Sequence, residues 1–379
     1  MDANATVPPS DAAIAAWMDA SRSSPLNPSS AHAAGRNALR LIEEARYAVA
    51  DFLGGEADPD GVHFVSGGTE ANNLVINGFA RIAGSAIATL AVEHPSVTGP
   101  VRAAGGTFLP VRPDGVADLA ALSAFVRAAV GSPFLACVQA ANSETGVVQP
   151  LDRVIACIRE ANPGAFVMVD AAQAVGRVAV GTDGVDALTF SGHKVHAPSG
   201  TGVLYLSDRL KAELPRLVLG GGQEGGFRAG TQSVAGACGL AAALAERKAG
   251  FLAAVKAMAA LRDRFEALVT ASCPTAAVVG RETRRVPNTS CIMFPGSEAQ
   301  SLMARLDAMG VACSMGTACS SGRPQGSPVL KSMGFSDRDA SSSLRFSFSV
   351  MNTMDEVEEA AAAVGRAAAE EGRLNARGN

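Results

Sequence analysis

The chain has 379 residues, 48% of them hydrophobic, and a formal net charge of −4. A chain of this size and composition can bury a substantial core and is expected to form a large domain plus a smaller one. It has no basic run, so direct nucleic-acid binding is not expected. No apolar run reaches the roughly 18 residues that a membrane helix needs.

The cysteines and the N-terminal residues bear on location. Seven cysteines at irregular spacing, with no C-x-x-C pair, fit a reduced cytoplasm and make a zinc or other metal site unexpected. The first residues lack the positive region and apolar stretch of a signal peptide. We therefore expect a cytoplasmic protein that acts away from membranes.

Short apolar runs alternate with amphipathic stretches along the first two-thirds of the chain. Continuous apolar runs of this length are typical of strands covered on both faces, and they span residues 62–65, 87–92, 134–138, 166–169 and 187–190. The stretches between them that are expected to be helices include residues 33–53, 70–79 and 151–160. This alternation predicts an α/β fold with a mainly parallel sheet.

Polar residues follow several of these predicted strands at the point where the strand ends: Thr69, His94, Asn142, Asp170 and Lys194. Parallel sheets bind ligands at the carboxyl ends of their strands, so these five side chains are expected to converge on one cleft. Each also has an ordinary structural interpretation. Asp170 would suit a helix cap, Asn142 a turn, and Lys194 an exposed loop.

Together these residues have the chemistry of a pyridoxal phosphate (PLP) site. The cofactor aldehyde needs an amine, supplied by Lys194, and its pyridine nitrogen needs a carboxylate, supplied by Asp170. The ring of His94 would offer a flat surface to the cofactor. The turn that contains Gly68 and Thr69, at the start of a predicted helix, would bind the phosphate. Gln173 would reach the ring hydroxyl.

A second glycine pattern, G-x-G-x-x-G, occupies residues 220–225. A dinucleotide site of this kind needs a helix to start at once within a compact strand–helix–strand unit. Residues 226–230 intervene before any helical pattern, so a nicotinamide site is not predicted.

The last third of the chain contains two further candidates. Cys319 lies in a segment of small residues, glycine and proline that predicts a mobile, exposed loop. Since the pKa of an unperturbed thiol is near 8.5, some thiolate is expected at neutral pH. Arg345 lies in a short alternating segment, residues 343–347, that predicts a strand. It would bind a carboxylate through two parallel hydrogen bonds, or form a surface salt bridge.

The domain boundary is expected near residues 248–250, inside a long helix. The large domain would span residues 13–250, and residues 251–379 together with 1–12 would form a small domain that contains the cysteine loop. Residues 357–371 are expected to form a closing helix, and 372–379 a frayed end.

With these motifs assembled, the chain resembles the cysteine desulfurases of the nitrogen-fixation and iron–sulphur-cluster type, within the class V aminotransferases and PLP fold type I. The resemblance covers essentially the whole chain. The motifs that carry it are residues 4–6, 27–32, 66–73, 93–94, 142–146, 170–173, 191–194, 228–231 and the Cys319 loop.

The resemblance implies a seven-stranded-type, mainly parallel sheet flanked by helices, with a smaller α+β C-terminal domain. It also implies a role for each site residue. Lys194 would hold PLP covalently and shuttle protons, and His94 would stack on the ring and act as acid or base. Asp170 and Gln173 would hold the ring. The phosphate would be bound by Thr69, Ser191 and His193, and by Thr231 from the other protomer of a homodimer.

For the reaction, the resemblance implies that L-cysteine is bound through its carboxylate by Asn142 and Arg345. Cys319 would attack its sulphur, leaving alanine and an enzyme persulfide that is passed to an acceptor or iron–sulphur scaffold protein. Three departures from the family pattern stand out. The chain starts directly at Met1-Asp2, which suggests a shortened N-terminal arm, and Gly225 replaces a common arginine. Residues 346–349, after Arg345, replace a more usual ending with glycine and arginine.

Two alternatives stay open. One keeps the cofactor but changes the reaction, to a selenocysteine lyase or another class V aminotransferase. The other is a weakly active scaffold in a sulphur-transfer complex, which the short start and Gly225 would suit.

Overall fold

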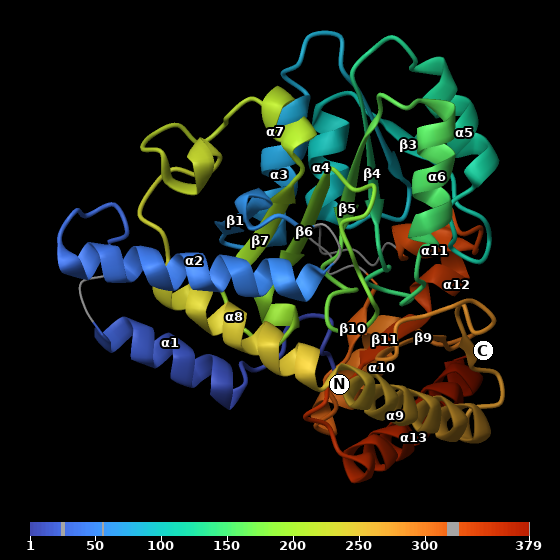
Figure 1. The fold of residues 1–379 in the computed structure, drawn as a ribbon. Coiled ribbons are helices and arrows are strands. Elements are labelled where there is room, and N and C mark those ends of the chain that lie inside the picture. The colour runs from blue at the N-terminus through green and yellow to red at the C-terminus, as the bar shows by residue number, and fades with distance from the viewer. Residues whose placement is uncertain (24–26, 55–56, 317–325, 379) are drawn as a thin grey trace.

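The computed structural model describes residues 1–23, 27–54, 57–316 and 326–378, with side chains up to residue 371. Two sheets organise these residues (Figure 1). The described part of the chain includes no helix that is both long and apolar enough to cross a bilayer.

The larger sheet has seven strands in the order β1-β7-β6-β5-β4-β2-β3. Its strands are β1 (Val62–Val65), β2 (Ala86–Leu90), β3 (Thr107–Leu109), β4 (Phe134–Gln139), β5 (Phe166–Asp170), β6 (Ala187–Ser191) and β7 (Gly202–Leu206). The strands from β3 to β6 pair in parallel, and β7 runs antiparallel to both of its neighbours. The predicted mainly parallel sheet is confirmed.

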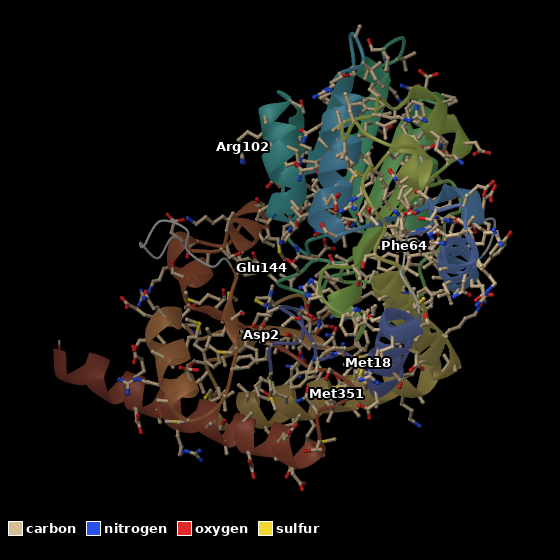
Figure 2. All side chains as sticks on the ribbon, turned by 90° about the vertical axis from the view of Figure 1, so that its left-hand side faces the viewer. Asp2, Met18, Phe64, Arg102, Glu144 and Met351 are labelled. Carbon is tan, nitrogen blue, oxygen red and sulfur yellow. The ribbon has the colours of Figure 1, made fainter. Side chains whose placement is uncertain are left out.

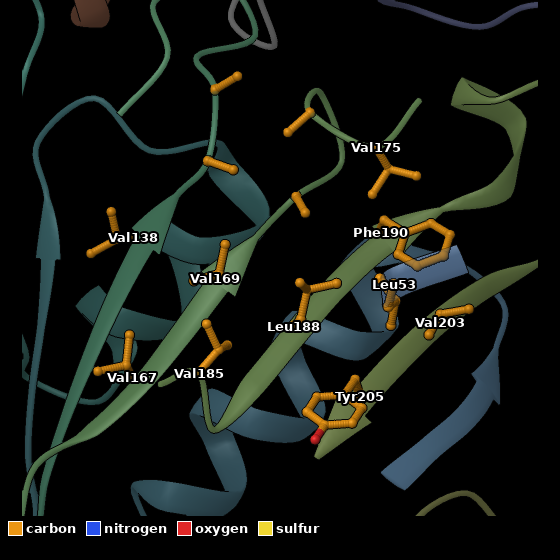
Figure 3. Close-up of a cluster of buried hydrophobic side chains, with 14 of the residues drawn as sticks. Leu53, Val138, Val167, Val169, Val175, Val185, Leu188, Phe190, Val203 and Tyr205 are labelled. Atoms are coloured by element: carbon orange, nitrogen blue, oxygen red, sulfur yellow. The ribbon is translucent and has the colours of Figure 1, made fainter. Parts of the chain in front are cut away.

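Helices cover both faces of this sheet. Successive residues of a strand point to opposite faces, so each buried strand contributes apolar side chains to the core on either side. The helices around it are α1 (Asp11–Ser23), α2 (Ala33–Leu53), α3 (Gly68–Phe79), α4 (Pro95–Ala103), α5 (Leu119–Ala128), α6 (Leu151–Ala161), α7 (Asp208–Glu213) and α8 (Val234–Ala249). In β5, Val167 and Val169 pack into the core under α2, α5, α6 and α8, whereas Phe166 and Met168 pack toward α3 and α4. Figure 3 shows the first of these cores.

The smaller domain is built on an antiparallel sheet in the order β10-β11-β9-β8. Its elements are α9 (Phe251–Ser272), β8 (Ala277–Val278), β9 (Thr289–Met293), α10 (Ala299–Ala308), β10 (Ser314–Met315), α11 (Pro328–Ser332), α12 (Asp337–Ser341), β11 (Ser343–Ser347) and α13 (Met354–Gly378). Phe265 packs against Phe346 and Phe348, at ring distances of 4.7 and 5.4 Å, in a core closed by α9, α10 and α13.

Several boundaries differ from the expectations. The predicted long helix around residues 248–250 is two helices, because α8 ends at Ala249 and Gly250 separates it from α9. The closing helix α13 begins at Met354 and continues to Gly378, past the predicted frayed end, since its alanine, glutamate and arginine residues are strong helix formers. Strands β3 and β7 were not among the predicted strands.

Candidate functional site

A cavity of about 260 Å³ lies at the carboxyl ends of β2, β4, β5 and β6. Most of the predicted cofactor residues meet there. The cavity is lined by Gly68, Thr69, His94, Ser96, Gln139, Ala141, Ser143, Asp170, Ala172, Gln173, Ser191, His193 and Lys194. A parallel sheet is expected to place its ligand at this edge.

Lys194 ends a short 3-10 helix (Gly192–Lys194) that follows β6 directly. Its Nζ donates to the backbone carbonyls of Asn4 and Ala5, the latter at 2.6 Å. Burial and the nearby cations Arg177 and Arg345 lower the pKa of this amine to about 8. Because a larger fraction of the amine is neutral at neutral pH than in an ordinary lysine, it is better prepared to attack a carbonyl.

Asp170 is the last residue of β5 and is 8% exposed. Its Oδ1 accepts from the backbone N–H of Ala172 at 2.9 Å, and its Oδ2 accepts from Nδ2 of Asn72 at 2.9 Å. Asn72 is fully buried, donates as well to Ser96 Oγ and accepts from Thr189 Oγ1 at 2.6 Å. The Asp170 carboxylate is therefore held in one orientation beside the cavity.

The start of α3 offers backbone N–H groups to an anion. Its N-cap residue, Gly67, makes no side-chain cap, and the N–H of Gly68 donates to Ser191 Oγ at 2.7 Å. A Cβ on Gly202 would lie 2.5 Å from Gly67 Cα, so β7 packs directly under the turn. With Ser191 and His193 also lining the cavity, these residues fit the phosphate of PLP.

Two histidines line the cavity as neutral rings. Burial lowers the pKa of His94 below its ordinary value, and that of His193 to about 4. His94 caps α4, and its Nδ1 accepts from the backbone N–H of Ser96 at 3.1 Å. The neutral ring therefore has its proton on Nε2. In His193, Nδ1 is 3.1 Å from Thr6 Oγ1.

Gln173 lines the cavity, and its side-chain amide is already hydrogen-bonded within the protein. Its Nε2 donates to the carbonyl of Asn4 at 3.2 Å, and its Oε1 accepts from Arg177. The predicted contact with the ring hydroxyl stays a prediction.

The two predicted carboxylate-binding residues do not line this cavity. Asn142 is 2% exposed and stabilises the turn after β4, where Nδ2 donates to Val92 O and Oδ1 accepts from the N–H groups of Glu144 and Thr145. Its neighbour Ser143 lines the cavity instead. Binding of a substrate carboxylate by Asn142 stays a prediction.

Arg345, on β11, is buried at the edge of the site. One of its terminal nitrogens donates to the Ser143 carbonyl at 3.0 Å and the other pairs with Asp2 at 2.7 Å. Arg345 Nε is buried and has no hydrogen-bond partner among the described residues. The guanidinium thus already pairs with a carboxylate of the protein itself, and its predicted binding of the substrate carboxylate stays a prediction.

Two further predicted residues are not among those that line the cavity. Cys319 is outside the described residues. Thr231 is exposed and does not line the cavity, so its predicted contact with a partner protomer stays a prediction. The glycine pattern at residues 220–225 leads into a short 3-10 turn (Gln223–Gly226) rather than a long helix.

Asn72 was missed from the sequence although it orients Asp170. One signal was present: Asn72 interrupts the buried apolar stripe of α3 formed by Ala71, Val75 and Ile76. A polar side chain in such a stripe needs a buried partner. Ser143 gave no comparable signal, because only the path of the turn decides whether it or Asn142 faces the cavity.

Comparison with known proteins identifies the family. The aminotransferase class-V model matches residues 1–359. Curated cysteine desulfurases include one from Nostoc, 36% identical over 341 residues that cover 88% of this chain and 83% of the relative. Another, cysteine desulfurase NifS of Azotobacter vinelandii, is 34% identical over 94% of this chain and 89% of its own length.

Solved structures agree with this. A NifS-like protein superposes with a TM-score of 0.88 at 29% identity, covering 96% of this chain and 97% of its own. A NifS-like protein from Rickettsia africae gives 0.87 at 28% identity, covering 97% and 98%. These matches confirm the predicted fold and support the predicted desulfurase function. The chain therefore belongs to the aminotransferase class-V family, and over most of its length it is similar to cysteine desulfurases.

Proposed function

We propose that this protein is a PLP-dependent cysteine desulfurase that converts L-cysteine to L-alanine and forms a persulfide on Cys319. The observation that carries the proposal is the cavity in which Lys194, Asp170 and His94 lie beside the turn at the start of α3, residues 67–69, which is called the phosphate turn below. When bound there, PLP supplies an electron sink for the bonding electrons released from the substrate.

The residues around the cavity divide the work. Lys194 holds the cofactor and moves protons at Nζ, for which a pKa of about 8 is well suited. Asp170, in the orientation fixed by Asn72, would keep the pyridine nitrogen protonated. The ring of His94 would offer a flat surface to the cofactor and could exchange protons through Nε2. Arg345 is the proposed anchor for the substrate carboxylate.

The sulphur step balances without a further reactant. The Cys319 thiolate attacks Sγ of the substrate, an S–S bond forms, and the Cβ–Sγ bond breaks with its electron pair passing to carbon. That carbon takes up a proton to give the alanine methyl group. Cysteine and one enzyme thiol become alanine and one enzyme persulfide.

We further propose that the protein works in the cytoplasm as a homodimer. Exposed Thr231 would then be available to a neighbouring protomer. The persulfide sulphur would pass to an acceptor protein for iron–sulphur cluster assembly or thiolation. A mass measurement in solution tests the homodimer. Capture of the proteins that receive sulphur from Cys319 tests the transfer to an acceptor.

The decisive experiment pairs two variants of the PLP-loaded protein. Cys319→Ala should abolish sulphide release from cysteine plus reductant while leaving PLP absorbance intact. Lys194→Ala should prevent the covalent trapping of PLP by borohydride and lower turnover by about a hundred- to ten-thousandfold. Full activity of Cys319→Ala would overturn the thiol role. Rates on selenocysteine and cysteine sulfinate separate the lyase and aminotransferase alternatives.

A further inference from the structure

Glu144 is a buried carboxyl group at the junction of the two domains (Figure 2). It follows Ser143, which lines the cavity, and it is 4% exposed. Burial raises the pKa of Glu144 to about 7, against the opposing effects of a hydrogen bond from Ser327 and the charge of Arg345. Nothing in the proposed reaction uses this carboxyl group directly.

The small domain meets Glu144 at two places. Ser327 Oγ donates to Glu144 Oε2 at 2.5 Å, and the same hydroxyl accepts from the N–H of Leu330 at 3.1 Å, which caps α11. A Cβ on Gly316 would lie 2.2 Å from Glu144 Oε2 and 2.8 Å from Ser327 Cβ. The Gly316 backbone therefore packs directly against the Glu144–Ser327 pair.

Gly316 and Ser327 have a special place in the sequence. Gly316 immediately precedes residues 317–325, which include Cys319, and Ser327 follows them after a single residue, Gly326. Gly326 is itself confined, since an added Cβ would lie 2.8 Å from the Ser341 backbone nitrogen. Both ends of the cysteine segment are thus fixed, and one carboxyl group of the large domain contacts the two residues that flank it.

The surroundings of Glu144 connect it to the substrate anchor. On β10, Ser314 pairs with Arg345 of β11, and Ser314 Oγ donates to Asp2 at 2.7 Å. Asp2 also pairs with Arg345, which binds the Ser143 carbonyl. The residues just before Gly316 are therefore set in register with the guanidinium beside the cavity.

We propose that Glu144 is a positioning residue for sulphur transfer, which holds Gly316 and Ser327 beside the cavity and so sets the reach of Cys319 toward the substrate. This inference rests on the proposed role of Cys319 as the sulphur acceptor. It requires no contact between Glu144 and the substrate. What it requires is that the two ends of the segment stay together beside Ser143.

The test measures persulfide formation on Cys319 by mass spectrometry in a single turnover of the PLP-loaded enzyme. Ser327→Ala and Glu144→Ala should each slow this step by at least about tenfold, because small misplacements of a reacting group lower rates steeply. The apparent affinity for cysteine, read from the PLP absorbance, should change far less. Glu144→Gln keeps an oxygen that accepts from Ser327 and should restore most of the rate.

Ser336→Ala is the matched control. Ser336 caps α12 through the N–H of Asp339, as Ser327 caps α11, but its hydroxyl contacts Asp339 and not Glu144. This variant removes a helix cap of the same kind and should keep the wild-type persulfide rate. The double variant Glu144→Ala/Ser327→Ala should be no slower than the slower single variant, since two residues that act as a unit are not additive.

Two outcomes would be adverse, and they are distinguishable. The variant Ser327→Ala keeps the buried Glu144 carboxyl group and removes only the hydroxyl that bonds to it. A wild-type persulfide rate in this variant would overturn the positioning role and leave the desulfurase proposal standing. Sulphide release by Cys319→Ala would instead overturn the proposed function, and this inference with it.

Discussion

Lys194 illustrates how single residues acquire chemistry from their surroundings. An ordinary lysine is almost fully protonated at neutral pH, whereas a pKa of about 8 leaves roughly a tenth of the Lys194 amines neutral at pH 7. Burial and two arginines produce this shift, and neither is visible in the local sequence. The same holds for Asp170, whose orientation depends on Asn72, 98 residues earlier.

Asn72→Ala is expected to weaken PLP binding and to destabilise the fold by about 1–3 kcal/mol, because it leaves buried polar groups on Asp170 and Thr189 without partners. Urea unfolding and PLP titration measure the two effects. Asn73→Ala is the control, since within the described residues the Asn73 side chain bonds to Thr69 and Asn77 of its own helix and not to Asp170. Equal losses in both variants would contradict a specific role for Asn72.

The sequence predicts the part of the site that follows from strand ends. Thr69, His94, Asp170 and Lys194 are found together because the carboxyl ends of parallel strands share one edge. Asn72, Ser143 and Glu144 escaped prediction because their roles come from tertiary contacts. Which of Asn142 and Ser143 faces the cavity depends on a turn whose path no propensity specifies.

At the scale of elements, the phosphate turn depends on a strand that was not predicted. β7 runs antiparallel beside β1 and β6, and Gly202 at its start leaves room for Gly67. The absence of a side chain at Gly202 therefore shapes the turn before α3. Strand β1 and helix α3 were predictable from local pattern, but their close approach to β7 was not.

Gly202→Ala is expected to destabilise the protein by about 1–3 kcal/mol, as overpacking does, and to weaken PLP binding. The new Cβ would lie 2.5 Å from Gly67 Cα and 2.8 Å from the Phe190 carbonyl, both backbone atoms. Denaturant unfolding and PLP titration test this.

Gly99→Ala on α4 is the matched control, because a Cβ there meets nothing within 4 Å. Replacing this helical glycine should stabilise the protein by about 0.5–1 kcal/mol. If both alanine variants bound PLP as tightly as the parent, the proposed packing under the phosphate turn would be wrong.

For the whole molecule, buried titratable groups make stability depend on pH in opposite directions. Glu144 has a raised pKa, so the folded state keeps a proton that the unfolded state loses. Its contribution to stability is present in full below the ordinary carboxyl pKa and is lost as pH rises to about 7. His63, buried with its pKa lowered to about 4, acts in the opposite sense.

Glu144→Gln separates these contributions. Relative to the parent, the free energy of unfolding of this variant should rise between about pH 5 and about pH 8, by up to roughly 3 kcal/mol, since the amide does not titrate. His63 is common to both proteins and cancels. Ser327 and Arg345, which oppose the rise in the Glu144 pKa, are also unchanged. The Cys291 thiol, whose pKa is raised to about 12 by burial and by the Glu144 charge, does not titrate in this range. A difference that stays constant with pH would contradict the assigned titration.

The first ten residues connect the two domains. Asp2 bridges to Ser347, the Asn4 side chain bonds to Thr289, and the N–H groups of Val7 and Ser10 donate to the carbonyls of His193 and His196. The Met1 amine is itself partly buried, which lowers its pKa. Because the carbonyls of Asn4 and Ala5 accept hydrogen bonds from Lys194 Nζ, any change that displaces these first residues is expected to reach the catalytic amine, although about 190 positions separate them in sequence.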